Sequence, residues 1–326
     1  MKSKENIRIQ WLILGTGVLL MTGKFTAFLI THSDAILTDA AESVVNVLAA
    51  LLGLYSLLLA AKPKDKDHPY GHGKVEFISS SVEGGMIIMA GLAIVIKSIY
   101  SLFVPHEIHS LDTGIILIVA SGLLNFLVGL LVERKGKTNN SPVLISGGKH
   151  LQSDAYSTAG LIVGLAILYF TSWRWLDSAV AMLFGGIIMI TGYRILRKSI
   201  SAIMDETDMD LIDTIIQTIG KNRSPNLIDV HNMRAIKYGS MLHVDCHITV
   251  PYYLTVEEAH HEIDTIDKWI NEHFENRVEF FIHTDACVEA SCRICNKTEC
   301  LVRKNPFERE IPWNLETVIR NQKHGL

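Results

Sequence analysis

Six long apolar segments, separated by short polar stretches, constrain the fold of this chain more than any other feature. They lie at residues 9–30, 35–61, 77–103, 113–132, 143–170 and 176–195. An α-helix needs roughly 20 apolar residues to cross a bilayer, and each segment reaches that length. With 48% hydrophobic residues and a mean hydropathy of +0.26, the chain is more apolar than a soluble protein of 326 residues usually is. We therefore expect an α-helical, multi-pass protein with six transmembrane helices in a lipid bilayer.

Lysine and arginine predict the orientation of these helices. Basic residues precede the first segment, separate the second from the third, follow the fourth and end the sixth. The opposite loops at residues 31–34 and 104–112 contain none, and the last contains only Arg174. By the positive-inside rule, both termini face the cytoplasm, as expected of a protein of the inner (plasma) membrane. The first segment is too long for a signal-peptide core, and the net charge of −4 does not suggest nucleic acid as a partner.

The sequence pattern changes after Met204. Residues 241–250 alternate strictly between apolar and polar side chains, which is typical of a half-buried strand. Helical periodicity before and after it, and further strand-like stretches, predict a cytosolic αββαβ domain with its helices on one side of a small sheet. We expect domains at 1–204 and 205–286, followed by a cysteine-bearing tail at 287–326.

Several polar residues fall inside the apolar segments. The second segment carries Asp39, Glu42, Ser43 and Asn46 within one sector of a helix, and the fifth carries His150 and Asp154 one turn apart. A charged residue at a helix centre costs about 2.5–3.5 kcal/mol on the insertion scale, so such residues are usually functional. Two carboxylates and an imidazole suit a divalent first-row metal. The alternative is hydrogen bonding between helices.

At these residues the chain resembles the cation diffusion facilitator family, whose members are homodimeric metal/proton antiporters with six helices and a cytosolic metal-chaperone-like domain. The resemblance rests on Leu37-Thr38-Asp39 and the later His150-x-x-x-Asp154, and it extends over residues 8–287. Zinc members have Asp-x-x-x-Asp in the second helix, so the resemblance implies a transport site of Asp39, Ser43, His150 and Asp154. Because Ser43 replaces an aspartate, the fourth ligand would be Ser43, Asn46, Glu42 or water.

The resemblance implies further sites outside the membrane. The loop after the second segment carries Asp65, His68 and His72 at the positions of a family loop site; from composition alone, it could be a solvated turn. Lys74 and Asp205 match a charge pair at the family's dimer contact. The ligands implied in the cytosolic domain are His231, His247, His260, His283 and Asp285.

The tail contains Cys287, Cys292, Cys295 and Cys300 in a Cys-x4-Cys-x2-Cys-x4-Cys pattern. Close cysteines in a reducing compartment usually bind metal rather than form disulfides. Structural zinc is our leading interpretation, with unliganded thiols and an iron–sulfur cluster as alternatives. Cys246 falls on the apolar face of its strand and is expected to be packed in the core.

These features predict a transporter rather than an enzyme. We expect zinc(II)/proton antiport out of the cytoplasm, with zinc also bound at regulatory sites. The alternatives are an exporter of iron(II), cobalt(II) or manganese(II), and a membrane-anchored metal sensor or store. A sensor would have no use for acids at mid-membrane depth, and a metallohydrolase would need an open water position beside a general base, for which no substrate pocket is indicated.

Overall fold

The computed structural model describes residues 2–31, 34–103, 112–171 and 174–325. Within these ranges the side chains of residues 2, 27, 30–39, 41–42, 112–118, 161–162, 164–171, 174 and 176–177 lie outside the described part. The chain divides into two compact units, Met1–Met204 and Asp205–Leu326. Each unit has a hydrophobic core of its own.

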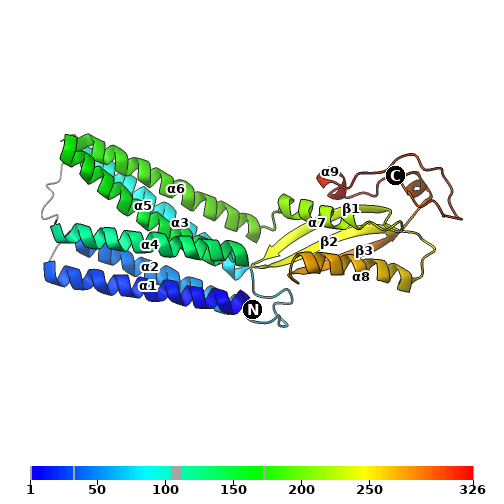
Figure 1. Cartoon of the computed structure of the whole chain (residues 1–326), viewed down its shortest axis with the longest axis horizontal. Coiled ribbons are helices and arrows are strands. Elements are labelled where there is room, and N and C mark those ends of the chain that lie inside the picture. Colours follow the sequence, from blue (N-terminus) through cyan, green and yellow to red (C-terminus); the bar gives the residue numbers. More distant parts are fainter. Residues whose placement is uncertain (1, 32–33, 104–111, 172–173, 326) are drawn as a thin grey trace. The chain divides into compact units, whose positions relative to one another are not determined.

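Long helices make up the described part of the first unit, and Figure 1 shows them running side by side. They are α1 (Lys2–Thr31), α2 (Asp34–Ala60), α3 (Val75–Phe103), α4 (Asp112–Asn139), α5 (Pro142–Thr171) and α6 (Arg174–Ile203). At 1.5 Å per residue, helices of 27 to 30 residues are about 40–45 Å long, which exceeds the hydrocarbon thickness of about 30 Å.

Three of these helices contain described stretches that are long and apolar enough to cross a membrane by themselves. The stretches are Ser43–Ala60, Val75–Phe103 and Ser178–Ile203. The helices run beyond the predicted apolar segments; α4, for example, continues through four charged residues between 133 and 137 to Asn139. Helical hydrogen bonding continues where the hydropathy falls, because Glu, Arg and Lys are good helix formers. The membrane assignment is supported for this unit, whereas the count of six spans stays a prediction.

The bundle is held by close backbone approach between helix pairs. A Cβ atom added at Gly84 of α3 would lie 3.0 Å from the carbonyl oxygen of Gly192 on α6, and one at Gly192 would lie 2.8 Å from that of Gly84. Small residues permit such contacts between membrane helices, which lack a hydrophobic driving force for association. A second set of contacts brings α2 and α5 together, and these helices carry the predicted transport site.

The second unit has the predicted order αββαβ. Its elements are α7 (Met209–Lys221), β1 (Asp229–Tyr238), β2 (Met241–Val250), α8 (Val256–His273) and β3 (Val278–Ala286). The sheet order is β1-β2-β3, with β1 antiparallel and β3 parallel to β2. The fold is therefore the one that alternation in 241–250 and its flanking helices predict (Figure 1).

The hydrophobic core of this unit lies between the sheet and the two helices. Ile215 and Ile219 of α7 and Ile266 and Ile270 of α8 are fully buried against the apolar face of β2. Cys246 lies in the same core at 1% exposure, as predicted, and burial raises the pKa of its thiol. Packing on this face leaves the alternate residues of β2 on the opposite face of the sheet.

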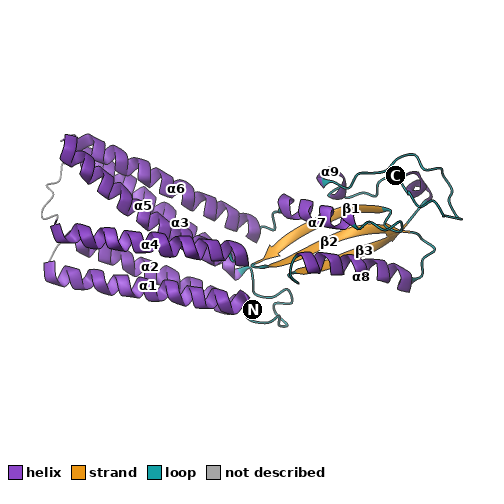
Figure 2. Cartoon of the chain, in the orientation of Figure 1, coloured by secondary structure: helices purple, strands orange, loops and turns teal. Residues whose placement is uncertain are grey.

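The cysteine-bearing tail packs on the second unit. It contains a short 3₁₀ turn, Glu289–Arg293, and one short helix, α9 (Leu315–Val318); Figure 2 shows that the rest is loop. Val318 is buried in the core, and the Arg223 guanidinium stacks 4.1 Å above the Trp313 ring. The tail is thus an integral part of this unit, although its composition alone gives no such indication.

Candidate metal sites

The first candidate site lies between α2 and α5. His150 and Asp154 occupy successive turns of α5, as their spacing predicts. Asn46 of α2 contacts both: its amide nitrogen donates to Asp154 Oδ2 at 2.6 Å, and its oxygen lies 2.9 Å from His150 Nε2. His150 is buried, and the other two are partly buried. An imidazole, a carboxylate and an amide oxygen are thereby gathered at one point between two helices.

The other predicted ligands of this site lie on α2. Ser43 is buried at 4% exposure, three residues before Asn46. Asp39 belongs to α2 one turn earlier still, but its side chain lies outside the described residues, as does that of Glu42. The sequence offers Asn46 only as one possible replacement for a missing ligand. In the structure it is the α2 side chain whose contact with both α5 residues is described.

Divalent metal binding fits the chemistry of this group. The hydrogen bond from His150 to Asn46 places a proton on Nε2 of the imidazole when it forms. A metal ion needs that nitrogen deprotonated and the carboxylate ionised, so metal and proton compete for the same atoms. The same three side chains can therefore hold either a hydrogen-bonded, protonated arrangement or a metal ion.

The second candidate site is the loop after α2. The ligand atoms of Asp65, His68 and His72 all lie within 4.8 Å of one another, as the family resemblance implies. Asp65 Oδ1 accepts from the His68 backbone N–H at 2.7 Å, and its Oδ2 lies 3.4 Å from His72 Nε2. The hydrogen bonds and the charges of the two histidines hold the pKa of the Asp65 carboxyl below its usual range. The carboxylate is therefore ionised and ready to bind a cation.

The third candidate site is a row of histidines across the sheet. His231 on β1 pairs with His247 on β2, which pairs with His283 on β3. Neighbouring rings are 5.2 Å and 4.6 Å apart. Because side chains alternate along a strand, all three project from the face opposite the hydrophobic core. Register, rather than sequence proximity, brings them together.

Asp285 completes this group. Its Oδ2 lies 3.4 Å from His231 Nε2 and 3.2 Å from His247 Nδ1, and its Oδ1 lies 3.8 Å from His283. His231, His247 and Asp285 have ligand atoms within 4.8 Å of one another, and His283 flanks them. His260 does not join them within one chain. It lies exposed on α8, 3.5 Å from Asp264, and its role as a ligand stays a prediction.

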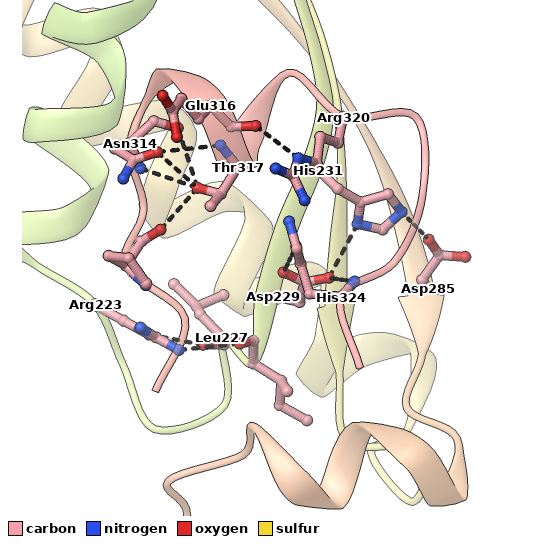
Figure 3. Close-up of polar contacts among 12 residues, drawn as sticks. Arg223, Leu227, Asp229, His231, Asp285, Asn314, Glu316, Thr317, Arg320 and His324 are labelled. Atoms are coloured by element: carbon pink, nitrogen blue, oxygen red, sulfur yellow. Dashed lines mark hydrogen bonds and ion pairs between the residues drawn. The ribbon is translucent and has the colours of Figure 1, made fainter. Parts of the chain in front are cut away.

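The C-terminal tail contacts one side of this third site, and Figure 3 shows His324 and Asp229 beside His231. His324 donates its backbone N–H to Asp229 at 2.9 Å, and its Nδ1 lies 2.8 Å from the other oxygen of Asp229. Lys323 lies 3.2 Å from Asp285. Asp229 in turn lies 3.4 Å from His231. The tail therefore supplies an ammonium group and an imidazole to the carboxylates around the site.

Two carboxyl pKa values reflect these contacts. Burial pushes the pKa of Asp229 upward, but hydrogen bonds with His231 and His324 outweigh it, and the pKa falls below its usual range. Burial also acts upward on Asp285, and the opposing contacts with Lys323 and His247 again lower the pKa. Both groups are therefore anionic at neutral pH. Sequence reasoning missed Asp229, Lys323 and His324 because no local pattern links a chain end to a strand.

The fourth candidate site is in the tail. Cys287, Cys292, Cys295 and Cys300 line one small pocket beside Ile228 and Pro251. All four are free thiols. Unlike the loop and sheet sites, these cysteines do not form a group with ligand atoms within 4.8 Å of one another. They share one pocket, but they are more widely spaced than the other two sets of ligands.

The predicted dimer contact is not tested by one chain. Lys74 immediately precedes α3 in the first unit, and Asp205 is the first residue of the second. The two residues therefore belong to different units, and their pairing stays a prediction.

Comparison with known proteins bears on both units. Residues 11–204 match the family model of the cation efflux transmembrane domain, and residues 207–287 match that of the cation efflux protein cytoplasmic domain. The tail after residue 287 lies outside both models. Together the two matches span both compact units.

Three relatives illustrate the range of the family. The uncharacterized transporter sll1263 of Synechocystis sp. is 33% identical over 264 residues, which is 80% of this chain and 84% of the relative. The manganese efflux system protein MneS of Bacillus subtilis is 27% identical, covering 74% of this chain and 82% of the relative. A cadmium, cobalt and zinc/H⁺–K⁺ antiporter of the same organism is 24% identical, covering 82% and 85%. The chain belongs to the cation diffusion facilitator family of membrane metal transporters.

Proposed function

We propose that this protein exports zinc(II) from the cytoplasm in exchange for protons. The observation that carries the proposal is the contact of Asn46 with both His150 and Asp154 inside the helix bundle. Buried ionisable groups in a membrane segment are costly and mark ion pathways. The imidazole, carboxyl and amide groups that meet between α2 and α5 would form the ion-binding site of such a pathway.

Proton exchange follows from the atoms involved. Zinc entering from the cytoplasmic side would displace the protons of His150 and take the carboxylate of Asp154. After the helices rock to face outward, protons would compete for the same nitrogen and oxygen atoms and release the ion. A histidine suits this exchange because its unperturbed pKa, about 6.5, lies near ambient pH. Asp39 and Ser43 would complete the ligand set from α2.

Ligand chemistry favours zinc among the candidate ions. Zinc accepts four ligands from imidazole and carboxylate and tolerates water at one position. Iron(II), cobalt(II) and manganese(II) remain alternatives because the Ser43 hydroxyl and the Asn46 amide are weak, neutral oxygen ligands of a kind that manganese accepts readily. The two named relatives from Bacillus subtilis illustrate this range, since one is a manganese system and the other handles cadmium, cobalt and zinc.

Zinc would also occupy resident sites outside the bundle. His72 would contribute its Nε2, which lies 3.4 Å from Asp65 Oδ2. Asp65 and His68 would complete that site, and His231, His247 and Asp285, with His283 beside them, would form the cytosolic site. Bound zinc would cross-link the loop segment or the strands that carry these ligands.

The proposal also includes the membrane topology and the oligomeric state of the protein. The distribution of basic residues supports six spans in the inner (plasma) membrane, with both termini in the cytoplasm. The cytoplasmic-domain match supports a homodimer. We place Lys74 and Asp205 at its contact, as the family resemblance implies. Metal bound at the cytosolic site would report the internal concentration to the transporting unit.

The test is transport by purified protein in sealed vesicles that contain a pH indicator. We expect zinc entry to be accompanied by proton exit, and zinc to be favoured over iron(II), cobalt(II) and manganese(II) in competition. Zinc movement without proton movement would refute antiport. A protein that binds zinc but moves no metal would instead be a sensor or store.

A further inference from the structure

The four tail cysteines line one pocket. Three of them lie beyond residue 287, where the match to the cytoplasmic domain ends. Cys287 directly follows β3, Cys292 lies in the 3₁₀ turn, and Cys295 and Cys300 follow in the loop. Ile228 and Pro251 provide an apolar wall, and Ile228 packs with Ile294 and Cys295 in a small hydrophobic cluster. The pocket is therefore built from three separate segments of the second unit.

The spacing of the sulfur atoms discriminates between the possible ligands. Four thiolates around one zinc ion, with Zn–S bonds of about 2.3 Å in a tetrahedron, place the sulfurs about 3.8 Å apart. The loop and sheet sites of this chain are gathered within 4.8 Å, but the four cysteines, all of which are described, are not. A cluster of several irons binds its thiolates through different metal atoms, so thiolates on different irons lie farther apart than four thiolates around one zinc ion.

Three features make this pocket suitable for thiolates rather than neutral thiols. The Tyr252 backbone N–H donates to Cys287 Sγ at 3.4 Å, and the Lys304 N–H donates to Cys292 Sγ at 3.5 Å. The Arg303 guanidinium lines the pocket and fixes the loop by donating to the carbonyls of Cys292 and Cys295 at 2.8 and 2.9 Å. Hydrogen bonds to sulfur and nearby positive charge stabilise a multiply anionic ligand set.

The chain spacing agrees with this assignment. Cys287-x4-Cys292-x2-Cys295 matches the beginning of the plant-type iron–sulfur pattern. The fourth ligand, Cys300, follows after four residues instead of coming from a remote segment, and Arg303 closes the loop that carries it.

We propose that Cys287, Cys292, Cys295 and Cys300 hold an iron–sulfur cluster that clamps the tail onto the cytosolic domain. The site is independent of the transport site between α2 and α5. The cluster would fix the beginning of the tail. The end of the same tail brings Lys323 and His324 to the sheet site.

The experiment is chemical analysis of the full-length protein purified without oxygen, before and after reconstitution with ferrous iron and sulfide. We expect broad visible absorbance and two or four irons per chain matched by an equal amount of acid-labile sulfide. Iron held by the histidine sites would bring no sulfide, so sulfide content identifies the cluster. The iron count distinguishes a [2Fe–2S] from a [4Fe–4S] cluster.

Matched variants connect the signal to the pocket. Cys292→Ser/Cys295→Ser should lose absorbance and sulfide, whereas Cys246→Ser, which alters the one cysteine in the sheet core, should keep both. A single zinc per chain, or no metal, together with no sulfide after reconstitution of the wild-type protein would overturn the proposal. That result is independent of whether the variants fold and of whether the protein transports zinc.

Discussion

Replacing Lys323 with alanine should strengthen zinc binding at the cytosolic histidine site. The ammonium group of Lys323 lies 3.2 Å from Asp285, the carboxylate that also contacts His231 and His247. A zinc ion that binds Asp285 must displace this positive charge or bind beside it. The Lys323 ammonium group therefore competes with zinc for the carboxylate of Asp285.

The magnitude follows from the exposure of the pair. The side chains of Lys323 and Asp285 are 20% and 17% exposed, so water still screens their attraction. Pairs of this kind contribute about 0.5–1 kcal/mol rather than the several kcal/mol that Coulomb's law gives at low dielectric. Since 1.4 kcal/mol corresponds to a factor of ten, the dissociation constant for zinc should fall about twofold to fivefold. The effect should shrink at high salt.

Calorimetry on residues 205–326 would measure this effect, because that unit has its own core. The tail cysteines stay in place in every variant, and the zinc binding that His247→Ala removes is assigned to the histidine site. Lys221→Ala is the matched control, since it removes the same charge at the end of α7, away from the site. If Lys323→Ala binds zinc no more tightly than Lys221→Ala, the ammonium group does not compete with the metal.

Three further outcomes are expected. Ser43→Asp should raise the preference for zinc over iron and manganese in competitive vesicle transport, because it adds a strong ligand one turn from Asn46. Unchanged zinc-to-iron and zinc-to-manganese transport ratios would show that Ser43 does not affect selectivity. His247→Ala should abolish zinc binding to a monomeric cytosolic unit and His260→Ala should leave it intact, as titration calorimetry would reveal; equal losses would mean that α8 reaches the site. Arg223→Ala removes hydrogen bonds to two carbonyls and the stacking on Trp313, so thermal unfolding of residues 205–326 should report a loss of about 1–3 kcal/mol; an unchanged melting temperature would show that this arginine does not anchor the tail.

The helices and the sheet were predictable from local pattern. Apolar runs longer than 20 residues leave few alternatives to long helices, and residues 241–250 alternate so regularly that β2 matches its predicted range. The three histidines of the sheet follow from the same alternation once the strands are in register. What local pattern could not locate were the ends of the helices, because charged residues continue a helix as readily as apolar ones.

The ligand sets were less predictable because they depend on distant contacts. Asn46 is a neutral residue one turn beyond a family position, and only its contact with α5 distinguishes it from a packing residue. His260 matches the family pattern, yet the fold places it on an exposed helix. Lys323 and His324 reach the sheet because the tail folds back over it, and no spacing in the sequence encodes that path.

Zinc uptake by vesicles containing Asp154→Asn protein tests the central claim most directly. Asp154 supplies the carboxyl group of the site, and asparagine keeps its shape but cannot carry a negative charge. Ser157→Ala is the control on the same helix, because that hydroxyl donates to the α5 backbone at Ser153. We predict that Ser157→Ala transports zinc like the wild type, whereas Asp154→Asn is folded but takes up no more zinc than protein-free vesicles. Zinc uptake at the wild-type rate by the Asp154→Asn protein would contradict a transport site between α2 and α5.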